Sequence, residues 1–192
     1  MTDKSEYEII SFKTPKELEK WLEKNHASSK GIWLRLFKKE SGEKFVTYKE
    51  ALDEMLCHGW IDGQVKKYDD KSWIRKFTPR GSKSIWSKIN TDHIERLTKE
   101  GRMKANGLAE VEKAKADGRW HKAYDSPTEM KMPDDFMKAV SKNKKAKIFF
   151  ESLNKANKYA IGWRLQTAKK PETREKRMQI ILQMMAEGKK FH

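Results

Sequence analysis

The chain has 192 residues, and its 43 lysines and arginines outnumber its 28 aspartates and glutamates, which gives a formal net charge of +15. A chain of this length holds one large domain or two small ones and buries enough surface to fold without disulfide bridges. Its single cysteine, Cys57, excludes an intrachain disulfide and suits a reducing compartment. No apolar run is long enough to span a membrane, and the N-terminus has no apolar stretch typical of a secretory signal, so the sequence predicts a cytoplasmic protein.

The excess positive charge lies in two blocks. Residues 66–104 carry 12 basic against 5 acidic side chains, and residues 138–192 carry 15 against 4. Basic blocks attract nucleic acid or anionic membrane surfaces, and a solvated lysine-rich face is the simpler alternative. Because the bases are spread over both blocks and not gathered on one recognition helix, any nucleic-acid binding is expected to be weak and non-specific.

The first 50 residues predict a helix followed by two strands. A helix over residues 14–25 begins with Thr14 as its cap, and Glu17 is placed to reach back in a capping box. Alternating side chains at residues 32–37 predict a strand, and a turn leads to a second, shorter strand at residues 44–48.

A second helix and a hairpin follow. Thr47 and Glu50 form a capping box at the start of the helix, and Gly59 suits the left-handed position just past its end. Residues 63–79 predict a β-hairpin that turns at Asp69–Asp70.

The remaining chain is predominantly helical. Helices are predicted from a cap near Asn90 or Thr91 to Gly101, and from Asn106 to Gly118. The fold class is therefore α+β, a small antiparallel sheet with packed helices followed by a helical C-terminal domain. The predicted divisions are an α+β domain at residues 1–118, a linker at 119–133 and a basic helical domain at 134–192.

The stretch LCHGWIDGQ, residues 56–64, has the residue types of a catalytic site. Cys57 and His58 are neighbours on a helix, however, so their side chains point about 100° apart and are poorly placed to act as a nucleophile pair. We interpret Cys57 as a buried apolar residue and His58 as a helix-terminal residue whose charged form the helix dipole favours. Asp62 is the weak candidate for a catalytic residue, and it is also able to pair with Arg35, Arg75 or Arg80.

A loop that follows the predicted hairpin suits anion binding. Hydroxyls, a glycine and two cations stand together beside a possible helix start, although the spacing is not that of a Walker loop. The predicted ligand-binding residues are Trp60, Arg75, Arg80, Ser82, Lys83, Ser84 and Trp86. No two histidines lie three to five residues apart and there is no second cysteine, so the sequence predicts no metal site and no cofactor.

Several runs resemble the YdeI/OmpD-associated (bacteriocin-protection) family of bacterial proteins. They are Cys57–Gly63, Phe77–Arg80, Ser84–Ser87 and Gly101–Met103, together with the tail from Phe149 onwards. The resemblance covers nearly the whole chain. It implies a role in bacteriocin protection or association with OmpD and no particular reaction, and the family is sometimes labelled periplasmic.

Two classes of function remain open on the sequence. The first is a cytoplasmic stress or envelope-defence protein that binds an anionic small molecule, an acidic protein surface or, weakly, nucleic acid. The second is an enzyme in which Asp62 is the general acid or base and Arg80 clamps an anionic substrate. The sequence favours binding, because nothing in it indicates a tuned pKa.

Overall fold

The computed structural model describes residues 7–190. The chain divides into two compact units, one made of residues 1–84 and 90–121 and the other of residues 85–89 and 122–192. We call them the α+β unit and the helical unit. The two are described separately below.

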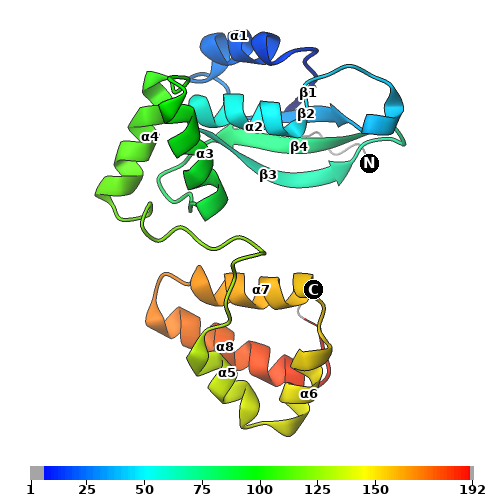
Figure 1. Ribbon diagram of the computed structural model, residues 1–192, viewed down its shortest axis with the longest axis vertical. Helices are drawn as coiled ribbons and strands as arrows, with labels where there is room; N and C mark the ends of the chain where they lie inside the picture. The colour runs from blue at the N-terminus through cyan, green and yellow to red at the C-terminus, as the bar shows by residue number, and fades with distance from the viewer. Residues whose placement is uncertain (1–6, 191–192) are drawn as a thin grey trace. The chain divides into compact units, whose positions relative to one another are not determined.

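The α+β unit is built around a four-stranded sheet with the strand order β1-β2-β4-β3 (Figure 1). β1 runs parallel to β2, whereas β2–β4 and β3–β4 are antiparallel pairs. The predicted α+β class is confirmed, but the sheet is mixed and not wholly antiparallel as predicted, because the undetected strand β1 joins it in parallel. Its elements in chain order are β1 (Glu8–Ile10), α1 (Pro15–Asn25), β2 (Ile32–Phe37), the 3-10 turn η1 (Lys39–Ser41), α2 (Tyr48–Cys57), β3 (Trp60–Lys67), β4 (Ser72–Pro79), α3 (Lys88–Lys99) and α4 (Ala105–Ala116).

The helix starts follow the capping chemistry of the sequence at two places. The hydroxyl of Thr14 accepts a hydrogen bond from the Glu17 N–H, while the Glu17 carboxylate accepts one from Lys13 at 2.8 Å and not from Thr14 itself. At α2 the full capping box of Thr47 and Glu50 is present. Gly59 has φ 75°, which confirms the left-handed end of α2.

Three sequence predictions in this unit are wrong. Residues 44–48 do not form a strand, because Val46 is held by a single bond from its N–H to the Phe12 carbonyl and Phe45 stacks on Phe37. The short parallel strand β1 was missed, since three residues carry too little periodicity to detect. Helix α3 begins at Lys88, ahead of the predicted caps at Asn90 and Thr91, which lie buried inside it.

The predicted hairpin is confirmed and is longer than expected. β3 and β4 pair from Trp60↔Pro79 to Lys67↔Trp73, and the chain turns between them through Asp69 and Asp70. An irregularity between Asp62 and Val65 shifts the register. Such a bulge re-aims side chains, and it lies next to the candidate residue Asp62.

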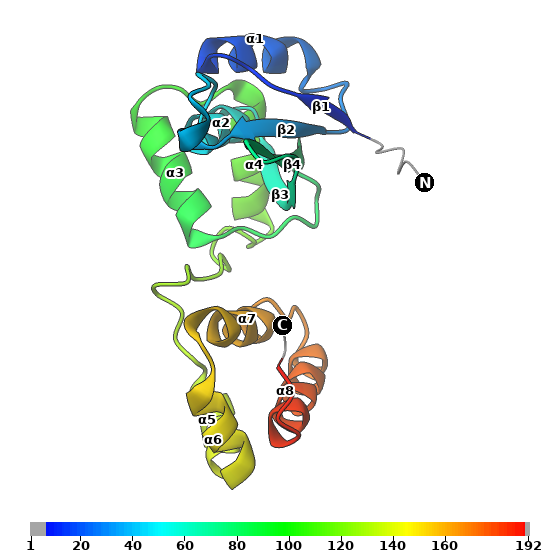
Figure 2. The same cartoon turned by 90° about the vertical axis from the view of Figure 1, so that its right-hand side faces the viewer.

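The helical unit holds α5 (Asp134–Ser141), α6 (Lys144–Ser152), α7 (Lys155–Gln166) and α8 (Pro171–Ala186). α6 packs on α5 and α8, and α7 packs on α8 (Figure 2). The core includes Phe136, Phe150, Ile161, Leu165 and Ile181. Residues 119–133, predicted as a linker, contain no helix, although Tyr124 forms an isolated bridge with Ser87.

Candidate functional site

Cys57 and His58 close the end of α2 and are buried. The Cys57 side chain is 1% exposed, and burial raises the pKa of its thiol to about 12, so the thiolate is absent at neutral pH. The prediction that Cys57 is a buried apolar residue is confirmed. The prediction for His58 is wrong, because burial lowers the pKa of its imidazole and so disfavours the charged form. His58 is neutral at the helix end, with Nδ1 3.0 Å from the Glu54 carbonyl oxygen.

The same helix end is fixed by a close approach of α4. A Cβ atom on Gly107 would lie 2.1 Å from the Cys57 carbonyl oxygen, so the position admits only glycine without a shift of backbone. The Lys104 N–H donates to that carbonyl at 3.1 Å, and the Asn106 amide donates to the His58 carbonyl at 2.7 Å. The residues that resemble a nucleophile pair therefore join two helices.

Asp62 lies on β3 and is engaged by two partners. The Tyr48 hydroxyl donates to Asp62 Oδ2 at 2.9 Å, and Arg75 Nη2 lies 3.2 Å from the same oxygen. The Arg75 guanidinium also stacks over the Tyr48 ring, 4.4 Å from its centroid. Burial raises the pKa of Tyr48, and the negative charge of Asp62 raises it further, so the phenol remains a donor. Among the arginines that the sequence offers to Asp62, Arg75 pairs with it, whereas Arg35 pairs with Asp69.

The loop at residues 80–84 is held mainly by its own contacts. Gly81 N–H donates to the Ser84 hydroxyl at 3.0 Å, and Ser84 N–H donates to the Gly81 carbonyl at 2.9 Å. Arg80 is 7% exposed, and its N–H donates to the Gly59 carbonyl at 3.0 Å. Ser82 and Lys83 are exposed. Only these two side chains of the loop face solvent freely enough to meet a ligand without rearrangement.

The two tryptophans of the predicted site belong to different units. Trp60 and Trp86 are each 1% exposed. Trp60 lies in the core of the α+β unit with its ring centroid 5.9 Å from that of Trp21. Trp86 belongs to the helical unit, where its carbonyl accepts the Tyr124 N–H at 3.0 Å. Neither indole is exposed to a ligand from solvent.

Two buried carboxylates on α2 were missed by the sequence reasoning. The Asp53 carboxylate lies 2.6 Å from Arg96 Nη2 and 3.0 Å from His93 Nδ1. The Glu54 carboxylate lies 2.6 Å from Arg102 Nη2. Burial raises the pKa of Glu54 despite its pairing with Arg102. Their partners lie 40 or more residues away along the chain, so local pattern gives no signal for them.

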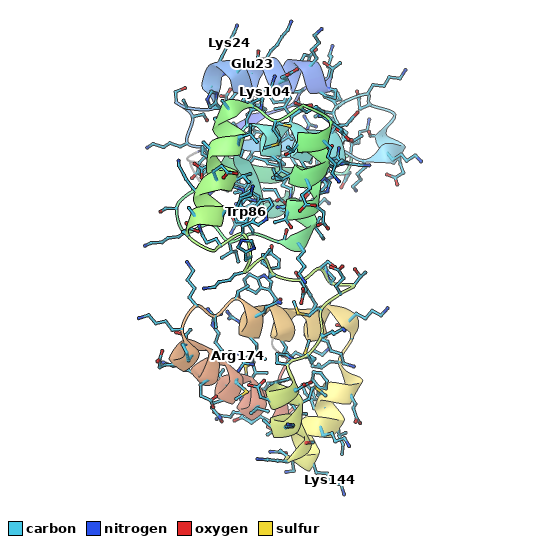
Figure 3. The ribbon with its side chains drawn as sticks, turned by 60° about the vertical axis from the view of Figure 1, so that its left-hand side comes forward. Glu23, Lys24, Trp86, Lys104, Lys144 and Arg174 are labelled. Atoms are coloured by element: carbon cyan, nitrogen blue, oxygen red, sulfur yellow. The ribbon has the colours of Figure 1, made fainter. Side chains whose placement is uncertain are left out.

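Cations of the sheet are also engaged within the α+β unit. The Lys66 ammonium lies 4.9 Å from the Trp33 ring centroid, and the Arg35 guanidinium lies 4.6 Å from that of Phe37. Arg35 pairs in addition with Asp69 at 2.7 Å. Lys104 pairs with the α1 carboxylates of Glu19 and, at 3.8 Å, Glu23 (Figure 3).

The helical unit has a different charge balance. It contains 18 basic against 8 acidic residues, whereas the α+β unit contains 25 against 20. Residues 138–147 include Lys138, Lys142, Lys144, Lys145 and Lys147, all exposed, and no acidic residue. We call these five the α5–α6 lysine cluster. Lys144 is at the start of α6 (Figure 3).

Two structural features are absent from the part of the chain that the structure describes. Within residues 7–190, no three histidine, cysteine or acidic side chains gather in a way that would hold a metal ion. Over the same residues, none of the helices combines the length and apolar character needed to cross a bilayer.

The fold and its charges define a two-part protein, an α+β unit joined in sequence to a basic helical unit. Residues 10–110 match a domain of unknown function (DUF8412), and because this match spans more than half of the chain, the protein belongs to that family. Residues 129–188 match the bacteriocin-protection, YdeI or OmpD-associated family, which confirms the suspected resemblance. The motifs at Cys57–Met103 all lie inside the first match. The second match lies in the helical unit and, of the resembling runs, covers the tail alone. No curated protein and no solved structure matches the chain.

Proposed function

We propose that the protein is a binding protein for an anionic partner and that the helical unit supplies the contact surface. The observation that carries this proposal is the excess of 18 basic over 8 acidic residues in that unit. Eight carboxylates are too few to neutralise 18 cations, so the unit keeps a formal net charge of +10. An excess of this kind attracts anionic surfaces and speeds their association.

The α5–α6 lysine cluster is the proposed centre of the contact. Its five ammonium groups stand on exposed positions within ten consecutive residues, with no carboxylate among them. The nearest acidic residues on these helices include Asp135, which is committed to Arg174 at 2.6 Å. Lys83 and Ser82, the exposed members of the 80–84 loop, are proposed as secondary contacts in the α+β unit.

The surroundings of Asp62 favour a binding function over catalysis. A general acid or base must exchange a proton with a substrate. Asp62 Oδ2 already accepts a hydrogen bond from the Tyr48 hydroxyl and pairs with Arg75 Nη2. We further propose a cytoplasmic location and a protective role under stress or at the envelope. The protective role rests on the family description of residues 129–188.

A titration at two salt concentrations tests the proposal. Two unrelated DNA duplexes and polyglutamate, each fluorescently labelled, are titrated with the full chain and followed by anisotropy. Neutralisation of about five phosphates predicts a log–log salt slope near −4.5 for the duplexes. Equal affinities for both duplexes support the proposal. No binding of any polyanion at low salt would leave the lysines as a solvated face and refute it.

A further inference from the structure

The helical unit contains a groove that is lined by apolar as well as positively charged side chains. Its volume is about 650 Å³. One wall is the segment 127–132, which presents Pro127, Met130 and Met132, and the other is the first two turns of α7. Most ligand sites occupy about 300–1,000 Å³, so the groove has the size for one small molecule.

The wall at residues 127–132 is held in place by a turn. The Ser126 hydroxyl donates to Glu129 at 2.8 Å, and the Met130 N–H donates to the Ser126 carbonyl at 2.9 Å. Ser126 itself is buried. The turn therefore gives the segment a defined shape, although the sequence predicts it as a linker.

Gly162 of α7 lets the methionines of this wall lie directly on the helix. A Cβ atom at Gly162 would come within 2.6 Å of Met132 and 2.8 Å of Met130. Methionine side chains are flexible and polarisable, and they adapt to apolar and aromatic ligands. This wall is apolar and adjustable.

The α7 wall supplies only hydrogen-bond donors and positive charge. It presents Lys155, Ala156, Lys158 and Tyr159, and no acidic residue lines the groove. Burial raises the pKa of Tyr159, and the charge of Asp125 adds to this, so its hydroxyl stays protonated as a donor. α7 begins at Lys155, so the positive end of its dipole lies at the same place.

Lys155 is the cation best placed for a ligand. The Lys158 ammonium already donates to the Glu151 carbonyl at 3.3 Å and lies over the Phe150 ring at 5.3 Å. Lys155 is exposed, and no side chain among the described residues pairs with it. A ligand anion beside Lys155 would also meet the start of α7.

We propose that this groove binds a small molecule with an apolar body and a single anionic group. The body would contact Pro127, Met130 and Met132, and the anion would meet Lys155 at the α7 N-terminus. The inference rests on the proposed preference for anions and adds to it a defined pocket and an apolar requirement. Charge complementarity and the limited volume favour a small amphiphile over a peptide chain.

The probe for the test is 8-anilinonaphthalene-1-sulfonate, which combines an aromatic body with one sulfonate. Its fluorescence is titrated against the full-length protein. The expected result is saturable binding of one probe, weakened about tenfold or more, or at least about 1.4 kcal/mol, by Ala156→Trp. Ala156 is exposed, so a tryptophan there fills the groove without entering the core. Lys155→Ala is expected to weaken binding about threefold, in line with one exposed charge contact.

Two matched controls make the result specific. Thr173→Trp adds the same ring at an exposed position of α8 outside the groove and should leave the affinity unchanged. Ile148→Ser alters a second, smaller groove of about 300 Å³ between α6 and α8. Probe binding that is lost in Ile148→Ser, or unaffected by Ala156→Trp, would overturn the proposal. Competition by an acidic peptide but not by decanoate would also overturn it, since the occupant would then be a peptide.

The groove and the basic surface fail separately. Ala156→Trp should leave polyanion binding unchanged, because it removes no charge. Changing the five lysines of the α5–α6 lysine cluster to Glu should abolish polyanion binding. The affinity for the probe should stay within about twofold, because none of the five lines the groove beside α7. Lys145 lines the smaller groove between α6 and α8. If the unchanged protein binds the probe but no polyanion, the proposed function is refuted alone, and if it binds polyanions but shows no saturable probe site, the groove is refuted alone.

Discussion

The two units use their charges in different ways. In the α+β unit, cations pair with carboxylates on other elements, as Arg96 does with Asp53 and Lys104 with Glu19. In the helical unit, the 18 basic residues exceed the 8 acidic ones by more than a factor of two, and the α5–α6 lysine cluster has no acidic residue among its members.

The difference separates charge that maintains the fold from charge that is available to a partner. A pair such as buried Asp53 with half-exposed Arg96 fixes the position of helices but adds little attraction for a ligand, because the cation is already neutralised. Exposed lysines contribute little to stability. They raise the local concentration of an anion instead. Variants should therefore affect folding in the first unit and binding in the second.

The largest expected effect on folding is at the contact between α2 and α4. Gly107→Ala places a Cβ atom 2.1 Å from the Cys57 carbonyl oxygen, and backbone must move to relieve the contact. We expect a loss of about 3 kcal/mol in the free energy of unfolding, at the upper end for overpacking. Urea denaturation followed by tryptophan fluorescence measures it. Gly63→Ala, where the nearest atom is 3.7 Å away, is the control and should have little effect.

Arg80 should matter to folding although the sequence predicts it as an anion clamp. Its side chain is 7% exposed, so Arg80→Ala removes packing as well as charge. We expect a loss of about 2 kcal/mol, within the usual range for a buried position. Lys83→Ala, in the same loop but exposed, should keep the melting temperature of the unchanged protein. Equal stability of the two variants would return Arg80 to the role of a ligand contact.

Cys57 tests whether the stretch at residues 56–64 is structural. A pKa of about 12 leaves almost no thiolate at neutral pH, and the side chain is buried. We expect Ellman's reagent to react with the native protein far more slowly than with the urea-unfolded chain. Cys57→Ala should cost about 1 kcal/mol, as for a small apolar group. Rapid labelling of the native thiol would contradict this account.

The smallest effect is a pH dependence of opposite sign at two carboxylates, Glu54 of the α+β unit and Asp135 of the helical unit. A raised pKa means that ionised Glu54 disfavours the folded state, so its cost is present at neutral pH and disappears as pH falls below its ordinary value of 4.5. Relative to the unchanged protein, Glu54→Gln should therefore be more stable at pH 7 than near pH 3, by less than about 1 kcal/mol.

Asp135 of the helical unit provides the contrast. Its pairing with Arg174 lowers its pKa to about 2, from an ordinary value of 3.8. The pair therefore stabilises the fold above pH 3.8, and this contribution is lost as pH falls through about 2. Thermal melts of Asp135→Asn and Glu54→Gln between pH 2 and 7 measure both trends. Parallel pH dependence of the two variants would contradict the opposite pKa shifts of Glu54 and Asp135.

Local chemistry made much of the fold predictable. Thr47 with Glu50 marks the start of α2 and Gly59 its end, since capping and left-handed backbone depend on a few adjacent residues. The strand predicted at residues 44–48 failed because burial of Val46 and Phe45 leaves the same apolar signal as strand pairing.

The candidate site was less predictable, because its contacts are distant in sequence. The Asp62–Arg75 pair was among the possibilities that the sequence allowed, whereas the partners of Asp53 and Glu54 arise only when α3 and the segment after it pack on α2. The groove beside α7 was missed for the same reason. Segment 127–132 contains Pro127, is followed by Pro133 and shows no periodicity. It forms a wall of the groove only because its methionines pack on Gly162.

A pair of matched charge reversals tests the central claim most directly. One variant changes Lys144, Lys145 and Lys147 of α6 to Glu, and the other changes Lys16, Lys20 and Lys24 of α1, which are exposed helix positions as well. Lys24 and Lys144 stand for the two sets in Figure 3. Both variants lower the net charge equally, so labelled-duplex anisotropy over a range of salt compares position alone. We expect the α6 variant to lose most of its affinity for the duplex, and the magnitude of its log–log salt slope to decrease by about 2.7. The affinity and the slope of the α1 variant should stay close to those of the unchanged protein. Equal losses in both variants would show that net charge, and not the helical unit, governs binding.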